Sequence, residues 1–166
     1  MILALKTNQD PAEIYLLADD GTVTQEKVWP AGRTLARDLL GEIEKLIRET
    51  SNIGHPASPT KTDEGSQDPV KESVDSATNK FAQSDKDEIF ANVSSLIVFK
   101  GPGSFTGLRI GITVANAIAY AQNIPIVGTT GENWRGDGLK KLSGGKNDKI
   151  VMPEYGAEPN ITKSRK

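Results

Sequence analysis

The sequence predicts an α/β fold built on one mixed β-sheet, with elements in the order β-β-β-α-β-α-β. Three short apolar runs before residue 30 are joined by polar turns, which favours an antiparallel meander. An amphipathic pattern over residues 33–49 and a strand–turn–helix pattern over residues 95–122 follow. A meander followed by alternating helices and strands indicates one sheet whose later strands are parallel through right-handed crossovers.

The first half of the chain supplies three strands and one helix of this fold. Residues 2–5 are a continuous apolar run, typical of a buried strand, and residues 13–17 form a second run. The Asp-Asp-Gly sequence at 19–21 is a hairpin signal that leads into a third strand at 22–29. Over residues 33–49 apolar side chains recur at helical spacing, which predicts a helix lying on the sheet.

Two segments differ in composition from the rest. Residues 51–87 are rich in serine, threonine, aspartate, lysine and proline and cannot bury enough apolar surface to offset their ordering entropy. We therefore expect a disordered insertion within a lobe at 1–131, with folding on a partner as the alternative. Glycine and lysine dominate after residue 131, which indicates a short irregular remnant and tail at 132–166.

Composition excludes several classes of function. The 166 residues carry a formal net charge of −2 and no cysteine, so nucleic-acid binding by the chain alone is not favoured and thiolate chemistry is excluded. His55 is the single histidine, and its low-complexity surroundings favour a solvated residue over a metal ligand. The N-terminus becomes polar too early for a signal peptide, and no apolar run reaches membrane length, so we expect a cytoplasmic protein without membrane contact.

The central motif is a glycine-rich turn that joins the strand at 95–99 to the helix at 106–122. Glycines and the free N–H groups of a helix start make an anion or phosphate site possible, at Gly101, Gly103, Ser104, Thr106 and Gly107. The known templates fail, however. A P-loop requires lysine and Ser/Thr after its last glycine, and a dinucleotide turn requires its third glycine one residue earlier. The alternative is that the glycines only permit a tight turn.

The helix after the turn has more apolar surface than one sheet covers. Gly107, Gly111, Ala115 and Ala119 recur every fourth residue and form a stripe where another backbone can approach closely. The apolar part spans more than half of the circumference, whereas contact with a sheet uses only about 100°. The first helix or another protein is therefore expected to cover the remainder.

The glycine-rich motif also carries a family resemblance. Residues 101–111, followed by Ala115-Asn-Ala117 and by 124–128, closely resemble the signature of the TsaB family, also called YeaZ. The order of elements is similar to an actin-like (ASKHA, ribonuclease H-like) N-terminal lobe, and residues 153–162 resemble the family's C-terminal end. The resemblance covers residues 1–50, 88–131 and 150–163.

The resemblance implies a non-catalytic accessory subunit in the synthesis of threonylcarbamoyladenosine (t6A) in tRNA. Its partner would be TsaD, the Gcp-type enzyme that transfers the threonylcarbamoyl group to adenosine 37, and the ATPase TsaE would join the assembled complex. Catalytic residues, metal and cofactor are accordingly not expected on this chain, since ATP and metal would belong to the partner subunits. Transfer RNA would be contacted only through the complex.

The resemblance further implies that the helices at 33–49 and 106–122 form a bundle with TsaD. The expected interface residues are the apolar and small side chains of both helices: Leu39, Ile43, Leu46, Ile47, Leu108, Ile110, Gly111, Val114, Ala115 and Ile118. A homodimer through the same helices is expected when TsaD is absent, because an uncovered apolar face favours a like surface.

Two departures from the family pattern bear on rival functions. Lys6-Thr7 stands where the first strand of such proteins commonly ends in Asp-Thr, which argues against a metal–phosphate role for the first turn. We also expect the C-terminal lobe to be vestigial, which would leave half of a nucleotide cleft. The enzyme alternative is a stand-alone ATPase that uses the Gly101–Gly107 turn. A protease is disfavoured because cysteine, an ordered histidine and an H-E-x-x-H motif are missing from the sequence.

Overall fold

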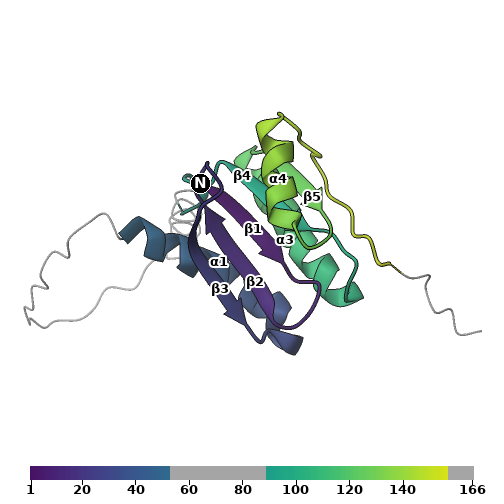
Figure 1. The fold of residues 1–166 in the computed structure, drawn as a ribbon. Coiled ribbons are helices and arrows are strands. Elements are labelled where there is room, and N and C mark those ends of the chain that lie inside the picture. The colour runs from purple at the N-terminus through teal and green to yellow at the C-terminus, as the bar shows by residue number, and fades with distance from the viewer. Residues whose placement is uncertain (53–88, 157–166) are drawn as a thin grey trace, which may run out of the picture.

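A computed structural model describes residues 1–52 and 89–156 of the chain (Figure 1). Its elements are β1 (Ile2–Lys6), β2 (Ala12–Leu17), β3 (Val23–Trp29), a 3-10 turn (Gly32–Thr34), α1 (Leu35–Asn52), β4 (Ser95–Phe99), α3 (Phe105–Gln122), β5 (Ile126–Thr129) and α4 (Trp134–Ser143). Apart from α4, these elements have the type and order that the sequence predicts. No helix among them is long and apolar enough to cross a membrane.

The strands form one mixed five-stranded sheet in the order β3-β2-β1-β4-β5. The meander is antiparallel, with Ile2 opposite Leu17 between β1 and β2, while β4 pairs with β1 and with β5 in parallel. All five residues of β4 are buried, which agrees with its continuous apolar sequence. The predicted α/β fold with one mixed sheet is confirmed.

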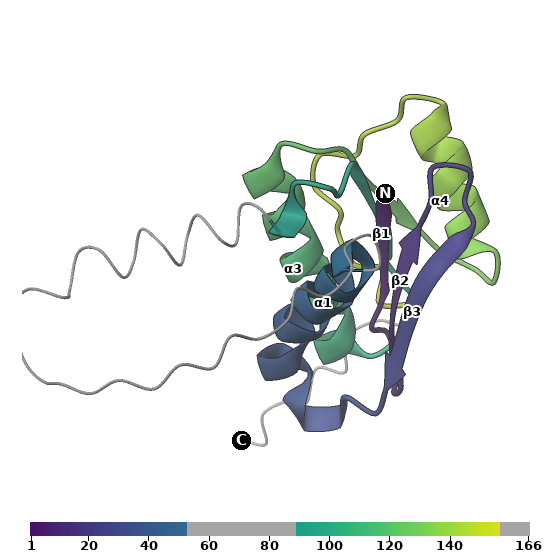
Figure 2. The same cartoon turned by 90° about the vertical axis from the view of Figure 1, so that its left-hand side faces the viewer.

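Helices cover the sheet on both faces, so the molecule has three layers (Figure 2). Helices α1 and α3 lie together on one face, and α4 lies on the other. The buried side of α1 carries its periodic apolar residues, Leu35, Leu39, Ile43, Leu46 and Ile47. On α3 the buried residues include Leu108, Ile112 and Ile118. Helix α1 therefore covers part of the apolar surface of α3. This agrees with the first of the two expectations, in which the first helix and not another protein covers that surface.

The expectation of an irregular segment over 132–166 is wrong where the structure describes it, because Trp134–Ser143 is helical. Trp134 is buried, and its ring lies 6.1 Å from that of Tyr15 and 6.0 Å from that of Phe99. Two glycines weaken the helical pattern, and one has a packing role. A Cβ on Gly138 would lie 2.4 Å from the Ile97 side chain, so glycine lets α4 approach the sheet closely.

Residues 51 and 52, which were expected to belong to the insertion at 51–87, are the last two residues of α1. The rest of that prediction, and the interpretation of His55, lie outside the described residues. The division of the chain into a lobe at 1–131 and a remnant stays a prediction.

Candidate functional site

The glycine-rich turn is held against the end of β1. The backbone N–H of Ser104 donates to the Asn8 carbonyl at 2.6 Å, and the Asn8 amide Nδ2 donates to the Pro102 carbonyl at 3.2 Å. Ser104 is the N-cap of α3, and its Oγ accepts from the Gly107 N–H at 3.4 Å. The turn thus uses its own donors and acceptors to fix the start of the helix.

The small residues of α3 face this same end of β1. A Cβ on Gly107 would lie 2.0 Å from the Thr7 carbonyl oxygen, and one on Gly111 would lie 2.0 Å from Thr7 Oγ1. The Thr7 hydroxyl donates to the Gly107 carbonyl at 2.8 Å, and the contact is buried. The close neighbour of Gly107 and Gly111 is therefore Thr7 of the same chain, the residue that directly follows β1.

Three of the five residues expected for an anion site border a hollow of about 220 Å³. Ser104, Thr106 and Gly107 line it, while the two other candidates, Gly101 and Gly103, are not among its lining residues. Asp10 also lines it, and its carboxylate accepts from the N–H groups of Ala31 at 2.8 Å and Gly32 at 3.3 Å. The hollow contains a carboxylate and no lysine or arginine among its described lining residues, which favours the structural interpretation of the turn.

Lys6 lies in a cluster with Glu13 and Tyr15. Lys6 Nζ contacts Glu13 Oε1 at 2.7 Å, and the Tyr15 hydroxyl donates to Glu13 Oε2 at 2.7 Å. The Arg135 guanidinium lies 4.2 Å from the centre of the Tyr15 ring. Burial, followed by the hydrogen bond to Glu13, raises the pKa of Tyr15 to about 12. Lys6 therefore forms an ion pair within the fold, and its ammonium group lies over the ring of Phe99.

A groove of about 440 Å³ lies between α1 and α3. Its described lining is apolar with a few polar groups: Ala36, Phe105, Thr106, Arg109, Ile110, Thr113 and Val114. Ile110 and Val114 are half-buried, while Phe105 is 55% exposed. Leu40, one helical turn after Ala36 on α1, is 39% exposed. The lobe therefore presents exposed apolar surface beside the groove.

Eight of the ten predicted interface residues are not part of this groove. Only Ile110 and Val114 line it, whereas the other eight are buried: Leu39, Ile43, Leu46, Ile47, Leu108, Gly111, Ala115 and Ile118. The sheet and the facing helix already cover these side chains in the described part of the chain, and their role as partner contacts stays a prediction. The prediction assigned the most apolar side of each helix to the partner, but that side forms the core.

The sequence reasoning missed Ala36, Phe105, Arg109 and Thr113 as groove residues. Arg109 and Thr113 are polar residues of α3, and the prediction named only apolar and small side chains as contacts. The usable signal is the exposed aromatic residue at the first position of the helix, Phe105.

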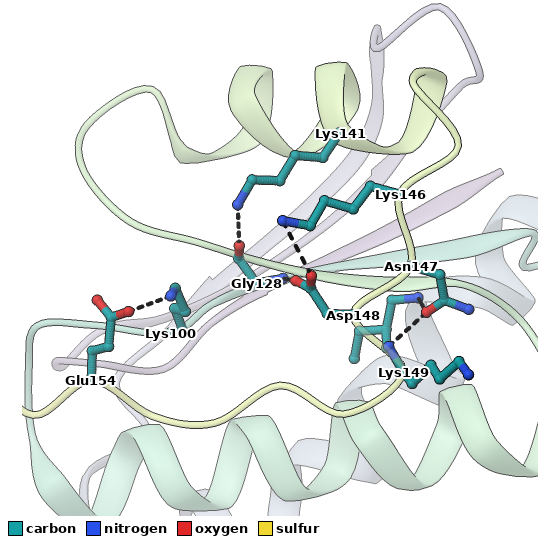
Figure 3. A network of polar contacts seen from close by, with 9 residues as sticks. Lys100, Gly128, Lys141, Lys146, Asn147, Asp148, Lys149 and Glu154 are labelled. Carbon is teal, nitrogen blue, oxygen red and sulfur yellow. Dashed lines mark hydrogen bonds and ion pairs between the residues drawn. The ribbon is translucent and has the colours of Figure 1, made fainter.

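A segment after α4, residues 147–155, crosses from β5 to α3 and is called the strap below (Figure 3). Asn147 and Asp148 accept from the N–H groups of Ile126 at 3.2 Å and Gly128 at 2.9 Å, so they satisfy the open edge of β5. The Asn116 amide makes two hydrogen bonds of 3.0 Å with the backbone of Val151.

The strap then reaches the start of α3. The Glu154 N–H donates to the Lys100 carbonyl at 2.6 Å, and the two side chains form an ion pair (Figure 3). Tyr155 stacks on Phe105 with ring centres 4.5 Å apart. The last described part of the chain therefore ends beside the groove.

Comparison with known proteins points to one area of tRNA modification. The family model described as TsaD, tRNA N6-adenosine threonylcarbamoyltransferase, matches residues 58–130. The TsaB protein of Bacillus subtilis strain 168 is 51% identical over 35 residues, which is 21% of this chain and 15% of that protein. The TsaB protein of Escherichia coli K12 is 41% identical over 39 residues, or 24% of this chain and 17% of that protein.

Longer matches have lower identity. The tRNA N6-adenosine threonylcarbamoyltransferase of Halalkalibacterium halodurans is 32% identical over 88 residues, which is 46% of this chain and 26% of that protein. The solved structure of YeaZ from Pseudomonas aeruginosa aligns with 78% of this chain and 43% of its own length, with a TM-score of 0.48 and 23% identity. The chain thus spans less than half the length of each of these relatives.

Proposed function

We propose that this chain is a TsaB (YeaZ)-type accessory subunit in t6A synthesis, and that it binds TsaD through the groove between α1 and α3. The observation that carries the proposal is the exposed apolar groove on the two helices that the family resemblance indicates. The relatives named for this pathway support the choice of partner.

The chemistry of the groove suits a helix of a partner protein. Half-buried Ile110 and Val114 offer an apolar floor, while Thr106, Thr113 and Arg109 provide a polar margin. Apolar grooves with polar rims are the usual sites for amphipathic helices, because the partner buries one face and leaves the other in water. Leu40 extends the apolar surface along α1.

We further propose that the chain supplies no catalytic group, and that ATP and metal belong to the partner subunits. In support, the Ser104 hydroxyl caps α3 and the Thr7 hydroxyl bonds to the Gly107 carbonyl, so both polar groups serve the fold. TsaE would join the assembled complex in the cytoplasm, and tRNA would be contacted through that complex. Without TsaD, the same groove would support a homodimer.

The test is the affinity of the full chain for its cognate TsaD, measured by calorimetry. Thr113→Arg and Ala36→Arg each place a long cation in the groove from an exposed position, so the fold should survive both substitutions. We expect each to weaken binding by at least about tenfold, because an unpaired charge is buried by the partner.

Val28→Arg is the matched control, since Val28 is 49% exposed and lies on β3, outside the groove. It should leave the affinity unchanged. Equal affinities for all three variants and the unmodified chain would refute the docking proposal. Tight binding of ATP and magnesium by the isolated chain would instead favour the ATPase alternative, which the Asp10 carboxylate beside the turn disfavours.

A further inference from the structure

The mouth of the groove carries a stack of three side chains that comes from two separate parts of the chain. The Arg109 guanidinium lies 5.1 Å from the centre of the Phe105 ring, and Tyr155 of the strap stacks on Phe105 at 4.5 Å with an interplanar angle of 30°. Phe105 and Arg109 both line the groove. The contact with Tyr155 restricts the Phe105 ring, and the cation–π contact favours a position of Arg109 over that ring.

The backbone on both sides of Tyr155 lies close to residues 100–102. The Glu154 N–H donates to the Lys100 carbonyl, and a Cβ on Gly156 would lie 2.6 Å from Pro102 Cβ. Asn116 holds Val151 through two hydrogen bonds further along the strap. Tyr155 is half-buried, so its ring is a firm support for Phe105 and not a freely moving side chain.

The positive charge of Arg109 is available to a binding partner. Among the side chains of residues 1–52 and 89–156 it forms no ion pair, in contrast to Arg37, which contacts Asp38 at 2.7 Å. Arg109 is exposed, and its planar fork suits a carboxylate with two parallel hydrogen bonds. The groove therefore combines an apolar floor with one unpaired cation at its mouth.

We propose that Arg109 selects an acidic side chain on the partner helix, and that Tyr155 is a positioning residue that holds Arg109 in place through Phe105. The occupant of the groove is thus an amphipathic helix with an aspartate or glutamate beside its apolar face. This inference rests on the proposed function, since it specifies what the groove recognises, and it adds a role for the strap.

The experiment measures the affinity of the full chain for its cognate TsaD at several salt concentrations. Arg109→Gln keeps the first three carbons of the side chain and a polar end group but removes the charge, and it should weaken binding about two- to fivefold and flatten the salt dependence. Tyr155→Ala should give a similar loss and the same flattening, whereas Tyr155→Phe, which retains the ring, should bind like the unmodified chain. The double variant of Arg109→Gln and Tyr155→Ala should bind no more weakly than Arg109→Gln alone.

Each outcome decides between the explanations. A salt dependence that Arg109→Gln leaves unchanged overturns the charge selection, and losses that simply add in the double variant overturn the positioning role. If Thr113→Arg weakens binding and the Arg109 and Tyr155 variants do not, this inference fails and the proposed function stands. If Thr113→Arg and Ala36→Arg both have no effect, the proposed function fails and this inference fails with it. If these variants change only self-association, a second copy of the chain occupies the groove and the inference is overturned.

Discussion

Replacing Gly111 by alanine tests whether the small stripe of α3 belongs to the core. The new Cβ would lie 2.0 Å from Thr7 Oγ1 and 3.0 Å from two carbons of the same side chain, in a buried contact. Overpacking of this kind costs about 1–3 kcal/mol. Displacing Thr7 also breaks its hydrogen bond to the Gly107 carbonyl, which is worth about 1 kcal/mol. Alanine regains about 1 kcal/mol in helix propensity, so we expect a net loss of about 1–3 kcal/mol.

The assay is urea unfolding followed by the fluorescence of Trp29 and Trp134. Gly41→Ala is the matched control, because Gly41 lies in α1 and nothing is within 4 Å of its added Cβ. It should stabilise the chain by about 0.5–1 kcal/mol. Adding Thr7→Ala removes the closest atom, so Gly111→Ala should cost at least about 1 kcal/mol less in that background. The reasoning fails if Gly111→Ala stabilises the chain as Gly41→Ala does, or if Thr7→Ala brings no relief.

Two further predictions concern the α4 side of the sheet and the strap. Because the pKa of Tyr15 is raised in the folded chain, the Tyr15 hydroxyl ionises at lower pH in the unfolded chain, and stability is lost as pH rises from 10 towards about 12. Tyr15→Phe should remove this part of the loss. Identical unfolding curves for both proteins above pH 10 would contradict the prediction. Asn116→Asp loses the N–H donor to the Val151 carbonyl. The substitution should therefore lower the free energy of unfolding by about 1–2 kcal/mol and speed tryptic cleavage after Lys149. Cleavage at the rate of the unmodified chain would show that Asn116 does not hold the strap.

The sequence was sufficient for the sheet and its two large helices because their signals are local. The apolar run that starts at Ile2 and the later apolar runs each predict a buried strand, and the Asp-Asp-Gly turn predicts the hairpin that joins β2 to β3. Helix α4 escaped prediction because Gly136 and Gly138 interrupt its helical pattern, and the reason for Gly138, its contact with Ile97, is a long-range one.

The site was less predictable than the fold. A helical wheel shows that Gly107 and Gly111 share one side of α3, but not that Thr7 occupies the space beside them. It also assigns Asn116 to solvent, whereas the structure pairs its amide with Val151, which is 35 residues away in the chain. Positions that depend on two distant segments, such as the stack of Phe105 on Tyr155, have no local pattern that would reveal them.

The most direct test of docking places a photo-crosslinking residue at position 113 and, in a second protein, at position 28. Both native side chains are exposed, but only Thr113 lines the groove between α1 and α3. After irradiation with the cognate TsaD, the proposal predicts a crosslinked heterodimer from position 113 and none from position 28. Crosslinks from position 28 alone, or from neither position although the complex forms, would contradict it.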